Sequence, residues 1–308
     1  MSAFSWRDFQ EDPQRAVPEI GEFLNDGALS LYVGAGASSG FGLPEWKILI
    51  ARILGKDRDA SLLARLDGGS PMELSKLLDS VDDGSLKYVS SVHQALYRDV
   101  EKDLLDQLQR SPLLLAVAAL ITGSCRGNVS SVVTYNYDDL LEQYLAMLGY
   151  SVCRRTQPDD LSTRADVELN YVNGYLDQRW SRTAPAPTIV LSARSMRAVR
   201  AEIDEGWSEM VVNGLHSKIG LFVGLSGDDN NILDVLERAK KKIKRGQGYN
   251  GYWLLTPDAF DRNGGQIADV GACPIRLRKE EIPNFIFMIC QAAAAKMGAV
   301  VLPATATP

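Results

Sequence analysis

The feature that most constrains this fold is a short apolar segment that runs directly into a glycine-rich turn. Residues 29–33 read Leu-Ser-Leu-Tyr-Val, and residues 34–38 read Gly-Ala-Gly-Ala-Ser. A buried strand followed by such a turn is typical of the βα unit that begins a nucleotide-binding domain. Its glycines let the backbone approach a pyrophosphate, whose charge the N–H groups of the next helix stabilise. The turn alone is weak evidence, because Ser39 replaces the third glycine of the usual dinucleotide fingerprint.

Strand-like and helix-like segments alternate along the rest of the chain. We predict strands at 29–33, 129–134, 169–172, 188–191, 221–224, 252–255 and 275–277, and helices at 13–25, 138–148, 194–206, 229–245 and 282–297. Such alternation favours an α/β fold, with a Rossmann-like, mainly parallel sheet covered by helices on both faces. Ligands of these sheets bind at the carboxyl ends of the strands.

One long stretch departs from this alternation and is helical throughout. Residues 46–123 have helical periodicity, with start signals at Ser70-Pro71 and Ser111-Pro112. We therefore predict three parts. Residues 1–45 and 124–299 form the Rossmann-like domain, residues 46–123 form an inserted helical module, and residues 300–308 form a flexible tail that is loose or docked on a partner.

Composition excludes several classes of protein. The 308 residues carry a formal net charge of −6, whereas a nucleic-acid-binding protein would present clustered positive charge. The four cysteines form no Cys-x-x-Cys pair, which argues against a zinc ribbon or a disulfide framework. The N-terminus has no apolar signal core, and no apolar run is long enough to span a bilayer. We expect a cytoplasmic protein that binds neither membrane nor nucleic acid directly.

Two further segments place polar residues at the ends of predicted strands. Residues 134–142 read Thr-Tyr-Asn-Tyr-Asp-Asp-Leu-Leu-Glu, and residues 224–232 read Gly-Leu-Ser-Gly-Asp-Asp-Asn-Asn-Ile. An amide and a carboxylate at a strand end, Asn136 and Asp138, suit the ribose hydroxyls and the nicotinamide of a dinucleotide. Local structure offers a simpler explanation, with Asn136 as a turn residue and Asp138 as a helix N-cap. The second segment is equally compatible with a plain strand-to-helix cap.

Taken together, these motifs resemble those of sirtuins. Residues 34–46 read Gly-Ala-Gly-Ala-Ser-Ser-Gly-Phe-Gly-Leu-Pro-Glu-Trp, similar to the sirtuin Gly-Ala-Gly-x-Ser motif that continues to Gly-Ile/Leu-Pro. Tryptophan after the proline is similar to the bacterial sirtuin-like defence family, since protein deacylases usually continue Asp-Phe-Arg. Residues 134–138 and 224–229 resemble the Thr-Thr/Tyr-Asn-Tyr-Asp and Gly-x-Ser-x-x-Asp segments of the same family. The three matches occur in the family's order across about 200 residues.

The resemblance implies an NAD site at the strand ends. It assigns the glycine turn to the pyrophosphate, the Asn136 motif to the ribose and nicotinamide, and the 224–229 segment to the adenosine side. The implied cofactor-binding residues are Gly34, Ala35, Gly36, Ser38, Pro44, Trp46, Asn136, Asp138, Gly224, Ser226 and Asp229, and the implied catalytic positions are Asn136 and Asn173.

Asn173 is the one departure from the family pattern. Residues 170–176 read Asn-Tyr-Val-Asn-Gly-Tyr-Leu where the family has x-Tyr-x-His-Gly-x-Leu. The histidine acts as a general base because its pKa lies near the working pH, whereas asparagine cannot accept that proton. Three explanations remain open: an inactivating replacement that traps ligand, a natural binding-only homologue, or an enzyme with its base elsewhere. We favour the first, because the other motifs are intact.

The function implied by the resemblance is NAD glycohydrolysis, which converts NAD to ADP-ribose and nicotinamide. Members of the family act as anti-phage abortive-infection effectors, so we expect a homo-oligomer or a partner such as a HerA-like ATPase. The alternative is a non-catalytic NAD or ADP-ribose sensor that regulates a defence complex. A protein deacylase is disfavoured, because the sirtuin zinc cysteines are absent, as is the histidine. No metal is expected. The two histidines present, His93 and His216, are interpreted as structural.

Overall fold

Seven parallel strands form one sheet in the part of the chain that the structure describes. The computed structural model describes residues 8–56, 59, 61–62, 71–100, 104–122, 129–197, 206–228, 230–242 and 249–296. The strand order is β3-β4-β2-β1-β5-β6-β7. The strands are β1 (Leu29–Val33), β2 (Ser131–Thr134), β3 (Val152–Arg155), β4 (Val167–Tyr171), β5 (Ile219–Val223), β6 (Gly251–Leu255) and β7 (Ala272–Arg276). The predicted α/β, Rossmann-like class is confirmed.

The strand order reverses direction at β1. From β1 the chain builds β2, β3 and β4 on one side, and then crosses to build β5, β6 and β7 on the other. The register pairs Val33 of β1 with Thr134 of β2 and with Val223 of β5, so these three strands end at one level. Such a reversal leaves a crevice outside the carboxyl ends of the two strands that flank it, which is where ligands of open α/β sheets bind.

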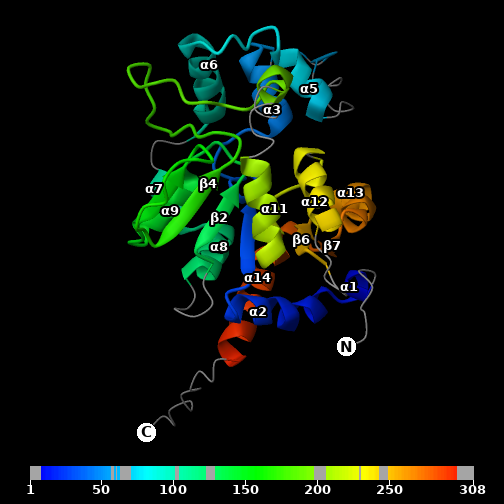
Figure 1. Ribbon diagram of the computed structural model, residues 1–308. Helices are drawn as coiled ribbons and strands as arrows, with labels where there is room; N and C mark the ends of the chain where they lie inside the picture. Colours follow the sequence, from blue (N-terminus) through cyan, green and yellow to red (C-terminus); the bar gives the residue numbers. More distant parts are fainter. Residues whose placement is uncertain are drawn as a thin grey trace.

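Helices cover both faces of the sheet (Figure 1). Alternate residues of β1 point to opposite faces: Leu29, Leu31 and Val33 enter one core, and Tyr32 enters the other. The first face is covered by α1 (Asp8–Glu11), α2 (Val17–Asn25), α7 (Leu104–Gln109), α8 (Pro112–Thr122), α9 (Leu140–Met147) and α14 (Ile282–Lys296). The second is covered by α11 (Trp207–Ser217), α12 (Asn230–Lys242) and α13 (Pro257–Asp269). Short 3-10 turns lie at Pro13–Ala16 and Lys279–Glu281.

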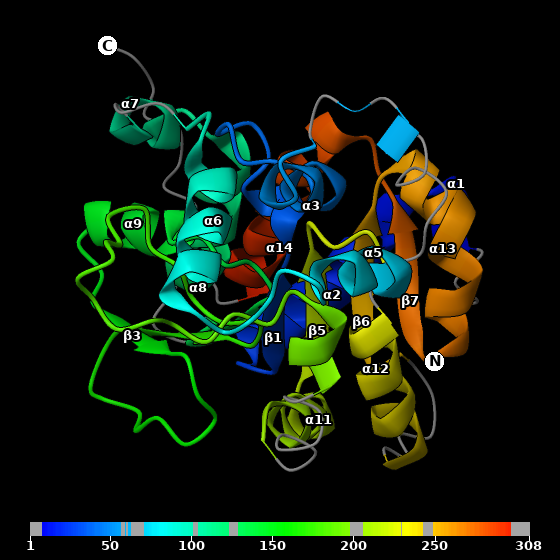
Figure 2. The same ribbon diagram turned by 90° about the horizontal axis from the view of Figure 1, so that it is seen from above.

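A third group of helices lies at one end of the sheet. It comprises α3 (Trp46–Ile53), α5 (Pro71–Leu78) and α6 (Leu86–Tyr97), which we call the helical layer (Figures 1 and 2). Its apolar core also takes in Tyr137, Leu176, Ile189 and Leu191 from segments that follow the strands. The layer therefore packs over the carboxyl end of the sheet. By contrast, α8 packs against α14 and contributes to the core of the sheet, although it lies within the predicted 46–123 module.

Several elements differ from those predicted from the sequence. The segment 188–191, which follows prolines at 185 and 187, forms no strand of the sheet and makes an isolated antiparallel bridge between Ile189 and Gly174. Strand β3 was not predicted because it is an edge strand with two arginines. Helix α13 was not predicted, because Gly264 and Gly265 in its interior lower the helix propensity of the segment. Helix α11 was also not predicted.

Parts of the remaining predictions fall outside the described residues. The helix predicted at 194–206 is seen at 193–197 only, and that predicted at 229–245 is seen as α12. The 300–308 tail also lies outside. Within the described ranges, none of the helices combines the length and the apolar character that a membrane crossing requires.

We expect the aromatic stack in the second core to be a major source of stability. The rings of Tyr32 and Phe222 stack with their centroids 4.6 Å apart, and those of Phe222 and Trp253 lie 4.7 Å apart. Phe222→Ala should lower the free energy of unfolding by about 3–5 kcal/mol, because it removes the fully buried central ring and leaves a cavity. Urea denaturation would measure this. The control is Leu115→Ala on the exposed side of α8, with a change within about 0.5 kcal/mol. A similar small change for Phe222→Ala would contradict the expectation.

Candidate functional site

The glycine-rich turn packs directly on the end of β5. Gly34 N–H donates to the carbonyl of Val223 at 2.9 Å, and Gly36 N–H donates to the carbonyl of Gly224 at 2.8 Å. A Cβ on Gly36 would lie 2.8 Å from the Gly224 Cα, so any side chain there would push the two backbones apart. Gly224 has a φ of 72° and a Cβ on it would lie 2.6 Å from Ala37 N, so glycine is required there too. The predicted residues Gly34, Gly36 and Gly224 therefore form one backbone platform, with Ala35 exposed on the 3-10 turn Ala35–Ala37.

Three polar side chains from two different strand ends meet beside this platform. Asn136 Nδ2 donates to Ser38 Oγ at 3.1 Å, and Ser38 Oγ donates to Asp138 Oδ1 at 3.0 Å. Ser38 follows β1, whereas Asn136 and Asp138 follow β2, so the interaction joins neighbouring strands 98 to 100 residues apart. All three side chains are buried, with exposed fractions between 4% and 8%. The structure thus brings together three of the residues predicted from the sequence.

Asn136 presents an acceptor that the described protein atoms leave unpaired. Its Oδ1 is buried and has no hydrogen-bond partner among the described residues, while its backbone N–H donates to Thr134 Oγ1 at 3.2 Å. Leaving a buried amide oxygen without a donor costs about 1–3 kcal/mol. A ligand with an N–H or O–H group at this position would remove that cost.

Asp138 is a carboxyl group held in a dry environment. Burial raises its pKa to about 6, although hydrogen bonds from Ser38 Oγ and from the Leu140 backbone N–H act in the opposite direction. The Leu140 bond, 3.2 Å long, comes from the first residue of α9. The N-cap of α9 is Asp139, which makes no side-chain capping hydrogen bond, so the N-cap role considered for Asp138 on local grounds is wrong. The Asp138 side chain belongs instead to the polar group with Ser38 and Asn136.

Asn173 lies at the end of β4, two residues past Tyr171. Its Nδ2 donates to the backbone carbonyl of Tyr135 at 3.1 Å, and Tyr135 follows β2 directly. The side chain is half-buried. Residue 173 thus adjoins the segment that carries Asn136 and Asp138, and the structure records no direct hydrogen bond from Asn173 to either.

The remaining predicted residues lie around this centre or away from it. Trp46 begins α3, and its ring stacks on that of Tyr137 with the ring centroids 6.4 Å apart. Pro44, two residues before Trp46 in the chain, is half-buried. Ser226 is exposed beyond the end of β5, where its carbonyl accepts from Asn263 Nδ2 at 2.9 Å. In the described part of the chain, the Ser226 side chain makes no hydrogen bond to Ser38, Asn136 or Asp138. Asp229 lies outside the described residues.

The structure adds residues that local sequence patterns do not indicate. Tyr137 Oη donates to the carbonyl of Val190 at 2.7 Å, and Tyr97 Oη donates to the carbonyl of Leu176 at 2.6 Å. Each contact joins segments more than 50 residues apart. Tyr137 belongs to the motif that carries Asn136 and Asp138, but the sequence does not indicate its partner, Val190.

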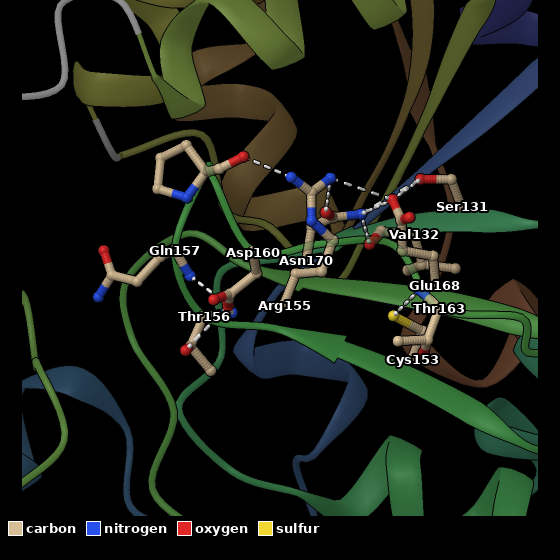
Figure 3. Close-up of polar contacts among 11 residues, drawn as sticks. Ser131, Val132, Cys153, Arg155, Thr156, Gln157, Asp160, Thr163, Glu168 and Asn170 are labelled. Carbon is tan, nitrogen blue, oxygen red and sulfur yellow. Dashed lines mark hydrogen bonds and ion pairs between the residues drawn. The ribbon is translucent and has the colours of Figure 1, made fainter.

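A second polar cluster lies under the β3 edge of the sheet (Figure 3). Arg155 approaches Glu168 and Asn170 at 3.5 and 3.4 Å, and Asn170 Nδ2 donates to Ser131 Oγ at 3.2 Å. The guanidinium carbon of Arg155 also lies over the Trp207 ring, 5.8 Å from the ring centroid. The cluster adds polar side-chain contacts between β2, β3 and β4 to the apolar packing of these strands.

A cavity of about 330 Å³ opens near the segment that follows residue 173. It is lined by Arg154, Thr156, Gln157, Tyr175, Pro187 and Thr188, none of which was predicted as a site residue. Within the described ranges, no group of histidine, cysteine, aspartate and glutamate side chains is arranged to hold a metal ion.

The chain matches a known protein family over part of its length. Residues 130–275 match the family described as the SIR2-like domain. The matched region runs from the start of β2 into β7 and contains Asn136, Asp138, Asn173, Gly224 and Ser226. The glycine turn and the helical layer lie outside it. No curated protein matches the chain. A SIR2-like domain indicates activity related to NAD, in agreement with the Rossmann-like sheet.

The raised pKa of Asp138 makes the stability of the protein depend on pH. The folded protein holds this proton up to about pH 6, whereas the unfolded chain releases it near 3.8. The stabilisation is therefore complete below about pH 4 and is lost as the pH rises through 6, at a cost of about 1–1.5 kcal/mol between pH 5 and 7.5. Asp138→Asn should remove this dependence, because the amide can still accept from Ser38 but does not ionise.

Thermal and urea unfolding of both proteins at pH 5 and pH 7.5 would measure the difference. Asp258→Asn, at an exposed position in the first turn of α13, is the matched control and should leave the pH dependence of the parent protein intact. Equal pH dependence in the Asp138→Asn protein and its parent would show that Asp138 is ionised throughout this range.

Proposed function

We propose that this chain binds NAD at the carboxyl ends of β1, β2 and β5, in a site built for NAD glycohydrolysis that Asn173 impairs. The observation that carries the proposal is the buried group of Asn136, Ser38 and Asp138 beside a side-chain-free backbone platform, at the point where the strand order reverses. The SIR2-like match, which covers the ends of β2 and β5, supports it.

The residues of the site suit the parts of NAD. Because the platform of Gly34, Gly36 and Gly224 has no side chains, a pyrophosphate can approach its backbone closely. The unpaired Asn136 Oδ1 can accept from the nicotinamide amide or a ribose hydroxyl. When ionised, Asp138 accepts hydrogen bonds only, which suits ribose hydroxyls. Ser226 and Asp229 would line the adenosine side, as the sequence resemblance implies.

Hydrolysis requires a proton acceptor that residue 173 does not supply here. The oxygen of water bonds to the ribose carbon as the bond to nicotinamide breaks, the bonding electrons leave with nicotinamide, and the water loses a proton. A histidine at 173 would polarise this water or a ribose hydroxyl, whereas the asparagine amide accepts no proton. The chain should therefore bind NAD and hydrolyse it slowly.

The proposed biological role is that of an anti-phage abortive-infection effector that depletes NAD. It follows from the resemblance of residues 34–46 to the bacterial sirtuin-like defence family, which also motivates homo-oligomerisation or a HerA-like ATPase as partner. The fold class alone does not carry this role.

A second candidate is a non-catalytic NAD or ADP-ribose sensor within a defence complex. The hydrogen bond from Asn173 Nδ2 to the Tyr135 carbonyl favours it, because an asparagine is accommodated at this position without an unpaired amide nitrogen. Calorimetric titration of NAD, with chromatography of the mixture for nicotinamide and ADP-ribose, separates the candidates. Binding without products agrees with both, rapid product formation contradicts the assignment of residue 173, and no binding contradicts the site.

Asn173→His distinguishes a disarmed enzyme from a sensor. If the rest of the site is competent, the replacement should raise the rate of NAD hydrolysis by about 10²–10⁴, the usual contribution of a general base. Release of nicotinamide is the measurement. Asn213→His, on the exposed side of α11, is the matched control and should give no increase. Tight NAD binding with unchanged turnover in the Asn173→His protein would favour the sensor.

A further inference from the structure

The backbone at residue 173 is held by a segment outside the sheet. Residues 188–192, which we call the strap, run antiparallel to residues 173–174. Val190 N–H donates to the carbonyl of Asn173 at 2.9 Å, and Ile189 bridges Gly174. A Cβ on Gly174, whose φ is 97°, would lie 2.0 Å from the Thr188 carbonyl oxygen. Since β4 ends at Tyr171, this close pairing fixes the backbone of residue 173.

The strap is in turn held by groups from the other side of the site and from the helical layer. Tyr137 Oη donates to the Val190 carbonyl at 2.7 Å, on the residue that also bonds Asn173. Ser192 Oγ donates to the carboxylate of Asp82, which follows α5, and both side chains are buried. Ile189 and Leu191 are buried in the apolar core of the helical layer.

Tyr137 connects the two halves of the site. Its neighbours in sequence are Asn136 and Asp138, its ring stacks on Trp46 of α3, and its carbonyl accepts from Leu176 N–H at 2.8 Å. Tyr137 therefore joins the residues of the polar group through its backbone, and the helical layer and the strap through its side chain. A shift of the strap relative to Tyr137 would move residue 173 relative to Asn136 and Asp138.

We propose that Tyr137 and the Asp82–Ser192 pair position the side chain of residue 173. They do so by holding the strap, which in turn holds the backbone of residue 173. The inference rests on the proposed function insofar as residue 173 takes part in hydrolysis. Neither Tyr137 nor Ser192 needs to contact NAD for this role. The helical layer then acts on the chemistry by holding the strap.

The activity test uses the full chain carrying Asn173→His. Adding Tyr137→Phe removes one hydroxyl and leaves the ring stack, so kcat should fall about tenfold or more while KM for NAD changes less than about twofold. Tyr88→Phe is the matched control, because the Tyr88 hydroxyl is buried in the same helical layer without a hydrogen-bond partner among the described residues. It should leave kcat unchanged. Ser192→Ala should act in the same direction as Tyr137→Phe, with Ser91→Ala on α6 as its control.

A spectroscopic test does not require activity. The sequence has two histidines, so the histidine introduced by Asn173→His adds one imidazole to a simple carbon-13 NMR spectrum of labelled histidines. Tyr137→Phe should shift the signal of the introduced imidazole, whereas Tyr88→Phe should not, with exposed His216 as internal reference. If the Asn173→His protein does not hydrolyse NAD but Tyr137→Phe still shifts the imidazole signal, the proposed function is rejected and the positioning role is kept. An unmoved imidazole signal, or a kcat that Tyr137→Phe leaves unchanged in an active protein, would overturn the positioning role.

Discussion

The arrangement of the site depends on the contact between the ends of β1 and β5. Two backbone hydrogen bonds, from Gly34 to Val223 and from Gly36 to Gly224, hold the glycine turn against the neighbouring strand. This contact exists only because neither Gly36 nor Gly224 has a Cβ. It also fixes the position of Ser38, through which the β1 end bonds the two polar residues of the β2 end. Wider separation of β1 and β5 would therefore disturb both the platform and the polar group.

Much of the fold followed from local sequence patterns, and the exceptions have physical causes. Strands β1, β5 and β6 are buried on both faces, so they read as continuous apolar runs and were predicted within one or two residues. The edge strand β3 escaped because its arginines bond to Glu142, Glu168 and Asn170, so polar side chains replace the expected alternation. Residues 188–191 have strand-like composition, but their partner is the turn at 173–174 and not the sheet.

The glycine turn and the polar residues of the site could be predicted from the sequence, whereas the contacts that hold the strap could not. The glycine turn and the Asn136 motif are local signals, and parallel strand ends bring them together whatever the rest of the sequence. Tyr137 and Val190 are 53 residues apart, and Asp82 and Ser192 are 110 apart. No spacing rule connects such pairs, because the helical layer and the strap meet only after both have packed on the sheet.

The surroundings of residue 173 explain how asparagine and histidine could share one position. The Tyr135 carbonyl accepts a hydrogen bond from the side chain at 173, and Asn173 supplies it through Nδ2. A neutral imidazole donates through one ring nitrogen and accepts through the other, so the same carbonyl would fix the tautomer and leave the second nitrogen as the base. We therefore expect the carbonyl to serve a histidine as the orienting partner that a general base needs. Asparagine satisfies that carbonyl equally well but has no second basic atom, so in the proposed site it would keep the geometry for binding and would slow hydrolysis.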